Sequence, residues 1–416
     1  MKILIFFSQL HISGGMEHTL TDKANYLSRQ GHKVMFVTYA SQEQPPAFPL
    51  DEHIRMADVN CRYFEAYRYS FFKRIWSLIK SKVKFRRKFR EIISDFKPDI
   101  IDIATPNTIF FIPDIVKLGR AKIVIESHTP YHFNMVRPPM AERVIDWQNP
   151  VIKAIRKTDL LITLTIGDAT CWRNLQVRNI TTIPNPIHYP ETNPDGRRRL
   201  DGRIICVGRL GREKRYDRMI DAFALIANRH SDWHIDIFGE GNEQQSLNRQ
   251  IASRSLSGRV TIHPPTSAIY SEYFKSQFLV LSSDYEGFGL VIIEAMACGI
   301  PVVACNCPFG PSDIIEDGIT GLLAKMEVKD LADKMEWMIT HDKERKNMGL
   351  KARKAAARYK SDVVMKEWEQ AYLSVIDNTH NITTSNRRFL TKFRRTMSDS
   401  VATQPVRNNC ESNQTF

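Results

Sequence analysis

The chain has 416 residues, of which 43% are hydrophobic and 25% charged, and a formal net charge of +13. This length allows two domains with full cores, because single hydrophobic cores stop growing at about 250–300 residues. The apolar runs are shorter than the roughly 20 residues of a membrane-spanning helix, and the apolar stretch after Lys2 is too short for a secretion signal. The seven cysteines lack the spacing of a disulfide framework or a zinc site. We therefore expect a cytoplasmic protein.

The first half of the chain alternates short runs rich in Ile and Val with amphipathic helical patterns. The runs predict strands at Lys2–Phe7, Lys33–Thr38, Ile100–Ile103, Lys122–Glu126, Leu160–Leu164 and Ile180–Ile183. Runs of this kind indicate a parallel sheet that helices cover on both faces. In such sheets a ligand binds outside the carboxyl ends of the strands, so a site is expected in the loops there.

Two of these loops carry candidate site residues. Gly14 and Gly15, in "FSQLHISGGMEHTL", follow the first expected strand and precede a helix that we expect to begin near Glu17. Paired glycines let the backbone approach a ligand closely, and a helix N-terminus offers free amides to an anion. An ordinary turn is the alternative interpretation. His128 follows the strand at Lys122–Glu126, although a lone loop histidine is more often structural than functional.

Residues 62–90 hold eleven basic residues and one acidic residue. Within them an apolar stripe at helical spacing consists of Phe72, Ile75, Trp76, Ile79 and Val83. This combination is typical of an interfacial helix that is drawn to anionic lipid. Nucleic acid is a weaker interpretation, because no recognised binding module surrounds the stripe. The ordinary alternative is a helix that packs on the first sheet and has a solvated basic back.

The second half of the chain repeats the rhythm of the first after the segment "IPNPI", which we interpret as a linker. Its runs predict strands at Arg203–Val207, His234–Phe238, Val260–Ile262, Phe278–Ser282, Ile300–Ala304 and Gly321–Leu323. We expect an α/β protein with two doubly wound Rossmann-like domains that face each other across a cleft. The expected divisions are domains at 1–185 and 186–354, a helix at 355–377 that packs back on the first domain, and a disordered basic tail at 378–416.

Two cations follow the strand at Arg203–Val207, in the stretch "CVGRLGREKRYDRMI". Arg209 and Lys214 are expected at the mouth of the second domain, where two fixed cations beside a helix N-terminus suit a diphosphate. Solvated surface charge is the alternative interpretation, and we expect it for the neighbouring Arg212 and Arg215.

Two glutamates lie in the stretch "SSDYEGFGLVIIEAMACGIPVV". On one helix they would be about 12 Å apart along the axis, so they would not share a proton. We therefore place Glu286 in the loop before a helix at Leu290–Cys298, and Glu294 inside that helix. Carboxylates suit sugar and ribose hydroxyls, because each offers two acceptor oxygens. The alternative is a helix-terminal carboxylate followed by an exposed one, but apolar residues surround Glu294.

Four segments carry a family resemblance: "GGME", "VGRLGREK", "EGFGLVIIEAMACGIPVV" and "GPSDIIEDGITGLL". They resemble the retaining, nucleotide-sugar-dependent glycosyltransferases of family 4, which have the GT-B fold. The spacing of Glu286 and Glu294 is that family's hallmark, and the resemblance covers residues 1 to about 376. "CNCPFGP" further resembles the subset that acts on hexoses and N-acetylhexosamines in surface-polysaccharide assembly. One departure is Pro186, which stands where many relatives have glycine.

The resemblance implies roles at the donor side of the site. The first glutamate of the pair, Glu286, would contact the transferred sugar, and Glu294 would hold the ribose hydroxyls. Arg209 and Lys214 would neutralise the diphosphate as it leaves, which is the main electrostatic effect in such a transfer. The donor sugar and phosphate would also bind the backbone amides of Phe288, Gly289 and Leu290.

The resemblance also implies roles for the first domain. Gly14 and Gly15 match the family's glycine loop, near the donor phosphates and the acceptor. His128 matches a family histidine near the anomeric centre. Because no Asp-x-Asp metal motif stands in a matching place, we expect metal-independent transfer with retention of configuration.

The function that we expect is transfer of a hexose or an N-acetylhexosamine from a UDP-sugar to a growing glycan acceptor that is lipid-linked. The partners would be this donor, this acceptor and, through residues 62–90, an anionic membrane surface on the inner face of the cytoplasmic membrane. One alternative is a nucleotide-sugar 2-epimerase of the same fold, which needs no acceptor. Another is a non-catalytic protein that binds nucleotide sugars, which the intact motif residues argue against.

Overall fold

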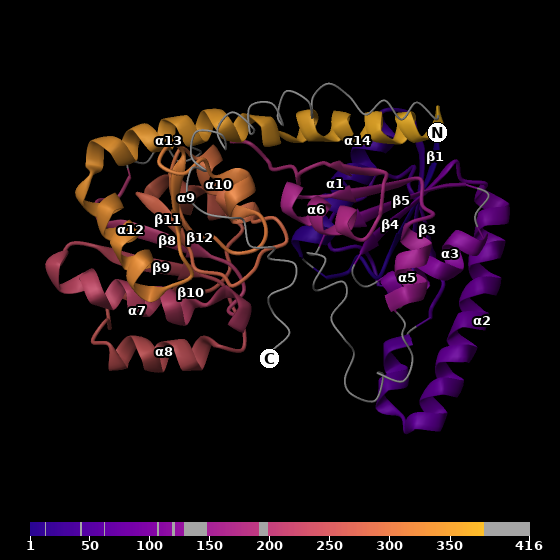
Figure 1. Ribbon diagram of the computed structural model, residues 1–416, viewed down its shortest axis with the longest axis horizontal. Coiled ribbons are helices and arrows are strands. Elements are labelled where there is room, and N and C mark those ends of the chain that lie inside the picture. Colours follow the sequence, from indigo (N-terminus) through magenta and orange to yellow (C-terminus); the bar gives the residue numbers. More distant parts are fainter. Residues whose placement is uncertain are drawn as a thin grey trace.

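The computed structural model describes residues 1–12, 14–41, 44–61, 63–105, 108–118, 121–128, 148–190 and 199–377. They form two α/β units side by side, each around one parallel sheet (Figure 1). The expected architecture of two Rossmann-like domains is therefore confirmed. The expected boundaries at residues 185, 354 and 377 stay predictions, and the expected tail at 378–416 lies outside the described residues.

The first unit contains a seven-stranded parallel sheet with the order β3-β2-β1-β4-β5-β6-β7. Its strands are β1 (Lys2–Phe7), β2 (Lys33–Thr38), β3 (Arg55–Asp58), β4 (Ile100–Thr105), β5 (Lys122–Ser127), β6 (Leu160–Thr163) and β7 (Ile180–Thr182). Six of them match the expected strands to within two residues. The sequence did not predict β3, because this short edge strand has no buried residue and therefore no apolar run.

The second unit contains a six-stranded parallel sheet with the order β10-β9-β8-β11-β12-β13. Its strands are β8 (Arg203–Val207), β9 (His234–Phe238), β10 (Val260–His263), β11 (Phe278–Leu281), β12 (Val302–Cys305) and β13 (Gly321–Ala324). All six were expected. β12 begins two residues later than expected, because Pro301 has no amide hydrogen to donate to the ladder.

Helices cover both sheets. In the first unit they are α1 (Gly15–Arg29), η1 (Tyr63–Arg68), α2 (Phe71–Phe96), η2 (Ile109–Phe111), α3 (Ile112–Leu118), α5 (Gln148–Ile155) and α6 (Ile166–Asn174). In the second unit they are η4 (Arg212–Lys214), α7 (Tyr216–Ile226), η5 (Ala227–Arg229), α8 (Gln244–Ser253), α9 (Ile269–Lys275), α10 (Leu290–Ala297), α11 (Pro311–Ile314) and α12 (Val328–Thr340).

The last helices tie the two units together. α13 (Asp342–Ala356) lies on the second unit, and after η6 (Ala357–Tyr359) the helix α14 (Ser361–Ile376) runs along the first (Figure 1). α14 buries one face in the core that β1 and α1 form, through Val364, Met365, Trp368, Tyr372 and Val375. The C-terminal helix therefore stabilises the first unit although it follows the second in the chain.

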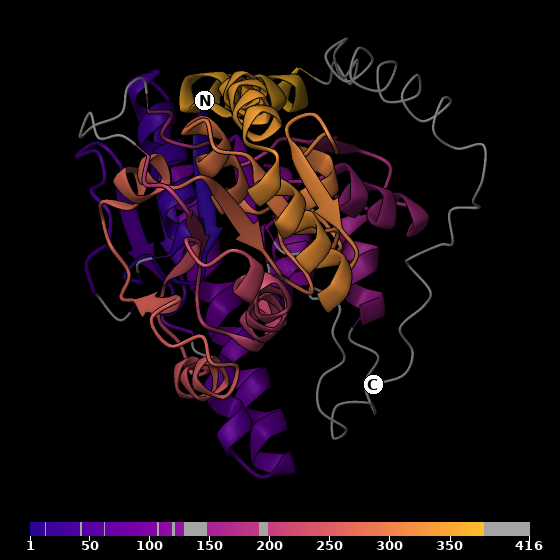
Figure 2. The ribbon, with the colours of Figure 1, turned by 90° about the vertical axis from the view of Figure 1, so that its left-hand side faces the viewer.

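α2 contains most of the basic segment. Its C-terminal half packs on the first unit through Phe85, Phe89 and Phe96, whereas its N-terminal half extends away from the sheet with η1 beside it (Figures 1 and 2). Val83 and Phe85 are two residues apart, so their side chains point in directions that differ by about 200° around the helix axis. Val83 therefore lies on a different face of α2 from Phe85. The ordinary alternative for this segment, packing on the sheet, therefore holds only for the C-terminal half.

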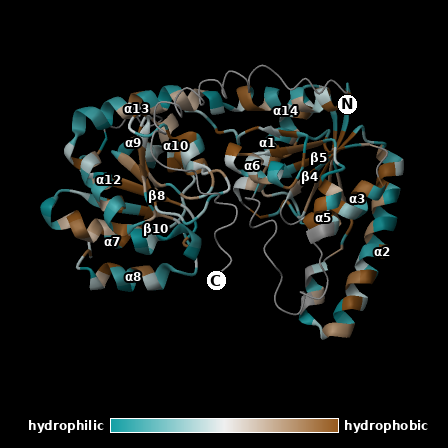
Figure 3. Cartoon of the chain, in the orientation of Figure 1, coloured by the Kyte–Doolittle hydropathy of each residue, from teal (hydrophilic) through white to brown (hydrophobic). Residues whose placement is uncertain are grey.

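The apolar stripe of α2 is largely exposed to solvent. Of its residues, Ile75 is half-buried, while the exposed fractions of Phe72, Trp76, Ile79 and Val83 are 83%, 71%, 57% and 61%. Figure 3 shows hydrophobic turns along α2 beside strongly hydrophilic ones. Among the described residues, no helix is both long enough and apolar enough to cross a bilayer.

Candidate active site

Two loops meet at the carboxyl ends of neighbouring strands of the second sheet. β8 and β11 pair directly with each other. The loop after β8 carries Arg209 and leads through η4 to α7, and the loop after β11 carries Glu286 and leads into α10. The sheet thereby brings the cation-bearing loop and the first glutamate to one edge, where parallel sheets bind their ligands.

Lys214 and Glu286 form an ion pair at this edge. The Lys214 ammonium lies 2.7 Å from Oε1 and 3.0 Å from Oε2 of Glu286. Ser283 Oγ donates a further hydrogen bond to Glu286 Oε1 over 2.6 Å. The side chains are 21% and 8% exposed, so the pair is mostly withdrawn from water but is not sealed from it. An ammonium has three donors and a carboxylate about four acceptor positions, so both groups can also bind a polar ligand.

Arg209 is not part of this pair. Its side chain is 75% exposed, and its guanidinium donates to Glu213 Oε1 over 2.6 Å. The structure therefore does not place Arg209 in contact with Glu286. An exposed ion pair of this kind contributes only about 0.2–1 kcal/mol, so the guanidinium can turn toward an anionic ligand at low cost.

The two neighbouring arginines differ from each other. Arg212 is solvated as expected, with a side chain that is 90% exposed. Arg215 is not merely solvated, because its guanidinium lies 2.9 Å from Asp217 and 3.1 Å from Asp284. Asp284 belongs to the loop that leads to Glu286, so Arg215 holds the two loops of the site together.

Glycine is required where the second loop enters α10. Gly289 is the N-cap of α10 with a φ of +99°, and a Cβ there would lie 2.9 Å from Ile292 Cδ1. A side chain at this position would therefore be strained. The preceding Phe288 is buried and packs edge-on against Tyr359, with ring centroids 5.8 Å apart. The loop before α10 is thus held in one conformation.

Glu294 lies in the second turn of α10 and is half-buried. The Tyr273 hydroxyl, from α9, donates a hydrogen bond to Glu294 Oε2 over 2.8 Å. Burial raises the pKa of Glu294, although the bond from Tyr273 and the positive charge of His18 oppose this. The structure thus agrees with the expected placement of Glu286 in the loop and of Glu294 within the helix.

The N-terminus of α1 contacts the second unit. A Cβ on Gly15 would lie 3.2 Å from Leu290 Cδ1, so a side chain there would require the end of the Leu290 side chain to shift. At Gly14, a Cβ would instead meet the Glu17 carboxylate. Gly14 has extended backbone angles, which any residue can adopt, so no left-handed turn requires glycine there. A second contact between the units joins the Gly167 amide and Asp313 Oδ2, 3.4 Å apart.

His128 lies directly after β5 and is 8% exposed. Its Nε2 is 2.7 Å from Glu126 Oε2. Burial and the nearby Lys23 ammonium lower the pKa of His128 to about 3, so the ring is neutral at physiological pH. Glu17, at the N-terminus of α1, is close enough to act electrostatically on the same ring. His128 therefore lies on the side of the first unit where α1 meets Leu290.

Sequence reasoning missed the groups that hold the expected site residues in place. Ser283 and Tyr273 bind the two glutamates, and Lys23 and Glu126 lie beside His128. One signal was visible for Glu126, because it interrupts an otherwise apolar strand. Tyr273 gave none, since a tyrosine on an amphipathic helix usually packs in a core.

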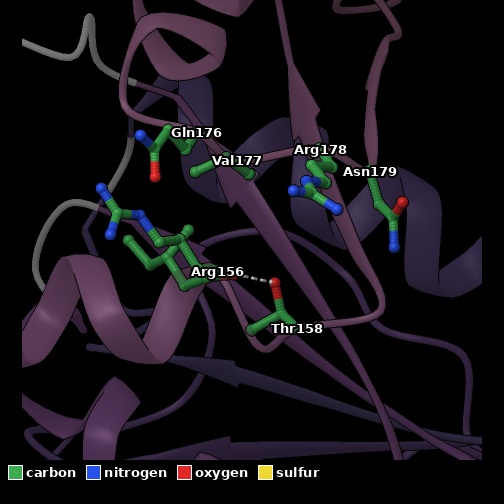
Figure 4. A pocket seen from close by; sticks show the side chains of 7 residues that line it. Arg156, Thr158, Gln176, Val177, Arg178 and Asn179 are labelled. Atoms are coloured by element: carbon green, nitrogen blue, oxygen red, sulfur yellow. Dashed lines mark hydrogen bonds between the residues drawn. The ribbon is translucent and has the colours of Figure 1, made fainter.

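A shallow pocket in the first unit lies away from this site. It is lined by Ile155, Arg156, Thr158, Gln176, Val177, Arg178 and Asn179 (Figure 4). Thr158 precedes β6 and Asn179 precedes β7, so the pocket lies at the amino ends of these strands. His128 follows the carboxyl end of β5, and none of the expected site residues lines the pocket.

Two protein-family models match the chain, one on each unit. Residues 13–189 match the model described as Glycosyltransferase Family 4, and residues 195–355 match Glycosyl transferases group 1. Among solved structures, TarM superposes with a TM-score of 0.72 at 17% identity, over 89% of this chain and 98% of that one. Anabaena HepE in complex with UDP gives 0.69 at 20% identity, over 90% and 100%.

The chain is a glycosyltransferase with the GT-B fold. Its sequence is 26% identical to an uncharacterized glycosyltransferase of Haemophilus influenzae, over 88% of this chain and 99% of that protein. A poly(ribitol-phosphate) alpha-N-acetylglucosaminyltransferase of Staphylococcus aureus is 29% identical over 52% of this chain, which spans 44% of the relative. The glycosyltransferase thus matches one relative from end to end and another over less than half its length.

Removing the charge of Glu294 should make this glycosyltransferase more stable to heat at neutral pH. Because the pKa of Glu294 is raised above its unfolded value, the ionised carboxylate costs stability at neutral pH. Glu294→Gln keeps an oxygen that accepts from Tyr273 and removes the charge. We expect its melting temperature at pH 7.5 to exceed that of the wild type, because the variant has no charge to bury at this position.

Differential scanning calorimetry between pH 5 and pH 8 measures this change. The gain should shrink as the pH falls through the raised pKa, where the wild-type carboxyl takes up its proton in the folded state. The exposed Glu91, changed to Gln, is the control and should leave the melting temperature unchanged. A Glu294→Gln protein that melts at or below the wild-type temperature at pH 7.5 contradicts the expectation.

Proposed function

We propose that this enzyme is a retaining glycosyltransferase of family 4 that moves a hexose or an N-acetylhexosamine from a UDP-sugar to a glycan acceptor without a metal ion. The observation that carries this proposal is the Lys214–Glu286 pair at the carboxyl edge of the second sheet, with Glu294 eight residues later on α10. The pair offers both a cation for the leaving diphosphate and acceptor oxygens for the sugar.

At the donor side, Lys214 would neutralise charge that develops on the diphosphate as the glycosidic bond breaks, and Arg209 would turn from Glu213 to join it. The Glu286 carboxylate would accept hydrogen bonds from hydroxyls of the transferred sugar. Glu294, held by Tyr273, would accept them from the ribose. The backbone amides of Phe288, Gly289 and Leu290, at the start of α10, would donate to the donor sugar and the phosphates.

At the acceptor side, the N-terminus of α1 at Gly14 and Gly15 would lie next to the donor phosphates, since Gly15 approaches Leu290. His128 would contact the sugar near its anomeric carbon as a neutral hydrogen-bonding group. With two cations available for the diphosphate, the leaving phosphate can itself take the proton of the acceptor hydroxyl. Attack from the same face then retains the anomeric configuration.

The names and complexes of relatives support the substrate class. The Staphylococcus aureus relative is named as an N-acetylglucosaminyltransferase that acts on poly(ribitol-phosphate), and a relative from Erwinia amylovora is named as an amylovoran biosynthesis glycosyltransferase. A TarM complex from S. aureus contains UDP together with alpha-GlcNAc-glycerol. We therefore propose a UDP-sugar donor and a polymeric or lipid-linked acceptor in polysaccharide or glycolipid assembly.

Release of UDP from a panel of UDP-hexoses and UDP-N-acetylhexosamines tests this proposal. We expect slow hydrolysis of at least one donor, unchanged by excess EDTA, to give a sugar whose initial anomeric configuration, read by proton NMR, matches the donor's. Lys214→Met should lower kcat/KM about 100- to 1,000-fold, because it removes a group that stabilises developing charge.

Arg212→Met is the matched control, since Arg212 is a solvated cation two residues away, and it should leave kcat/KM unchanged. Loss of activity with EDTA that added Mg²⁺ or Mn²⁺ restores would contradict the metal-independent mechanism. An inverted product would contradict retention, and an epimerised UDP-sugar with no free sugar would show a 2-epimerase instead.

We further propose that the exposed stripe of α2 binds an anionic membrane surface. Phe72, Trp76, Ile79 and Val83 recur at helical spacing on a face that no described part of the chain covers, and exposed cations lie beside them. The exposed basic residues of the helix are Lys73, Lys80, Lys84, Arg86, Arg87 and Arg90. Apolar side chains can insert at the boundary of the acyl chains while the cations attract anionic headgroups, at about 1 kcal/mol each. This surface would bring the first unit to a lipid-linked acceptor.

Sedimentation with vesicles measures this binding. The wild type should bind vesicles that contain phosphatidylglycerol, bind phosphatidylcholine vesicles weakly, and lose binding as salt rises, because the attraction is screened. A variant with serine at the four stripe positions should lose most of the binding without a change in melting temperature. Serine at the exposed Leu225 and Leu350 is the control and should bind normally. Equal sedimentation of wild type and stripe variant contradicts the proposal.

A further inference from the structure

A buried cluster of ionisable side chains lies beneath His128, and the proposed mechanism does not use it. Lys23 comes from α1, Asp102 from β4, Glu126 from β5 and Tyr372 from α14. None of these four side chains is more than 2% exposed. Burying several such groups is costly unless each is paired, so the cluster requires an explanation.

Lys23 is the centre of the cluster. Its ammonium lies 2.6 Å from Asp102 Oδ2 and also contacts Glu126 Oε1. Tyr372 donates its hydroxyl to Asp102 Oδ2 over 2.5 Å. The Trp368 ring lies below the ammonium, with its centroid 4.3 Å from Nζ. The ammonium is thus surrounded by two carboxyl groups and an aromatic face, an arrangement that favours its charge.

Asp102 and Glu126 differ in the groups that they contact, because Asp102 binds Tyr372 whereas Glu126 binds His128. Burial and the adjacent Glu126 raise the pKa of Asp102 well above its usual value. Burial disfavours the charge of Lys23, but Asp102 and Glu126 outweigh it and raise the pKa of Lys23. The Lys23 ammonium contacts Glu126 Oε1, so the ion pair of the cluster is assigned to Lys23 and Glu126. This assignment leaves Glu126 as a carboxylate, which accepts hydrogen bonds and cannot donate them.

The second oxygen of the Glu126 carboxylate determines which ring nitrogen of His128 carries the proton. Glu126 Oε2 lies 2.7 Å from Nε2 of His128, and the ring is neutral. A neutral imidazole bound to a carboxylate must place its single proton on the bound nitrogen. Nε2 then donates to Glu126, and Nδ1 carries a lone pair.

We propose that Glu126 is a positioning residue that holds His128 in this tautomer, so that Nδ1 accepts a hydrogen bond from a hydroxyl of the transferred sugar. The role of the sugar rests on the proposed function, whereas the tautomer follows from the contacts alone. Lys23 forms an ion pair with Glu126, and Tyr372 connects the cluster to α14, the helix that returns from the second unit.

The position of the cluster agrees with this role. Lys23 lies six residues, about 1.7 turns, along α1 from Glu17, which acts electrostatically on His128. The N-terminus of the same helix approaches Leu290 at Gly15. A rigid helix therefore joins the buried charge, the His128 ring and the loop proposed to hold the donor.

The tautomer is tested by nitrogen NMR of histidine-labelled wild-type enzyme, with His128→Asn used to assign the signals. We expect His128 to show a protonated Nε2 and an unprotonated Nδ1 at pH 7.5. In Glu126→Gln the amide can accept from or donate to the ring, so the two tautomers should mix. A protonated Nδ1 in the wild type overturns the proposal, and this result requires only that the His128→Asn protein used for assignment folds.

Kinetics separate positioning from packing. Glu126→Gln should lower kcat for donor hydrolysis in proportion to the fraction of His128 that leaves the Nε2-protonated tautomer, about twofold for an even mixture, with the KM for the donor nearly unchanged. The variant should fold, because removal of the Glu126 charge allows Asp102 to ionise and pair with Lys23.

The matched control is Tyr372→Phe, which removes a hydrogen bond from the same cluster and leaves the Glu126–His128 contact intact. It should lower the melting temperature with kcat nearly unchanged. Equal losses of kcat in the two variants would mean that the cluster is only structural, and would overturn the proposal. If the wild type hydrolyses no nucleotide sugar, the proposed function fails, while the NMR result still decides the tautomer.

Discussion

The approach of Gly15 to Leu290 is the constraint on which the geometry of the site depends. The two sheets each present a carboxyl edge, but neither edge alone carries both His128 and the glutamates. Because Gly15 has no side chain, only the Leu290 side chain lies between the N-terminus of α1 and the start of α10, which follows the glutamate-bearing loop of the other unit. A side chain at position 15 would require the Leu290 side chain to shift by a few tenths of an ångström.

The charges of the site are balanced differently in the two units. In the second unit, the Lys214–Glu286 pair remains partly open to water, so a ligand can replace some of its contacts without leaving a buried charge unpaired. In the first unit, the Lys23 cluster is sealed and includes Tyr372 from the last helix. The Lys214–Glu286 pair can therefore rearrange when a ligand binds, whereas the Lys23 cluster holds the surroundings of His128 in place.

Much of the fold was predictable because buried parallel strands are continuous apolar runs, and the loop and helix positions of Glu286 and Glu294 followed from spacing. β3 was not predictable, since an exposed edge strand has no such run. The orientation of Arg209 toward Glu213 also left no sequence signal, because the rotamer of an exposed side chain depends on its neighbours in space. The Lys23 cluster was visible only as isolated charges, since its partners are far apart in the chain and Tyr372 follows Asp102 by 270 residues.

The central claim is that a nucleotide-sugar donor binds at the carboxyl edge of the second sheet, with Glu294 on its ribose. Titration calorimetry of UDP into the wild type and into Glu294→Gln tests it most directly. The account predicts binding to the wild type and a loss of at least about tenfold in the variant, because a charged acceptor contributes about 1.5–3 kcal/mol to a hydrogen bond. Equal affinity for UDP in the two proteins, or no binding of UDP to the wild type, would contradict it.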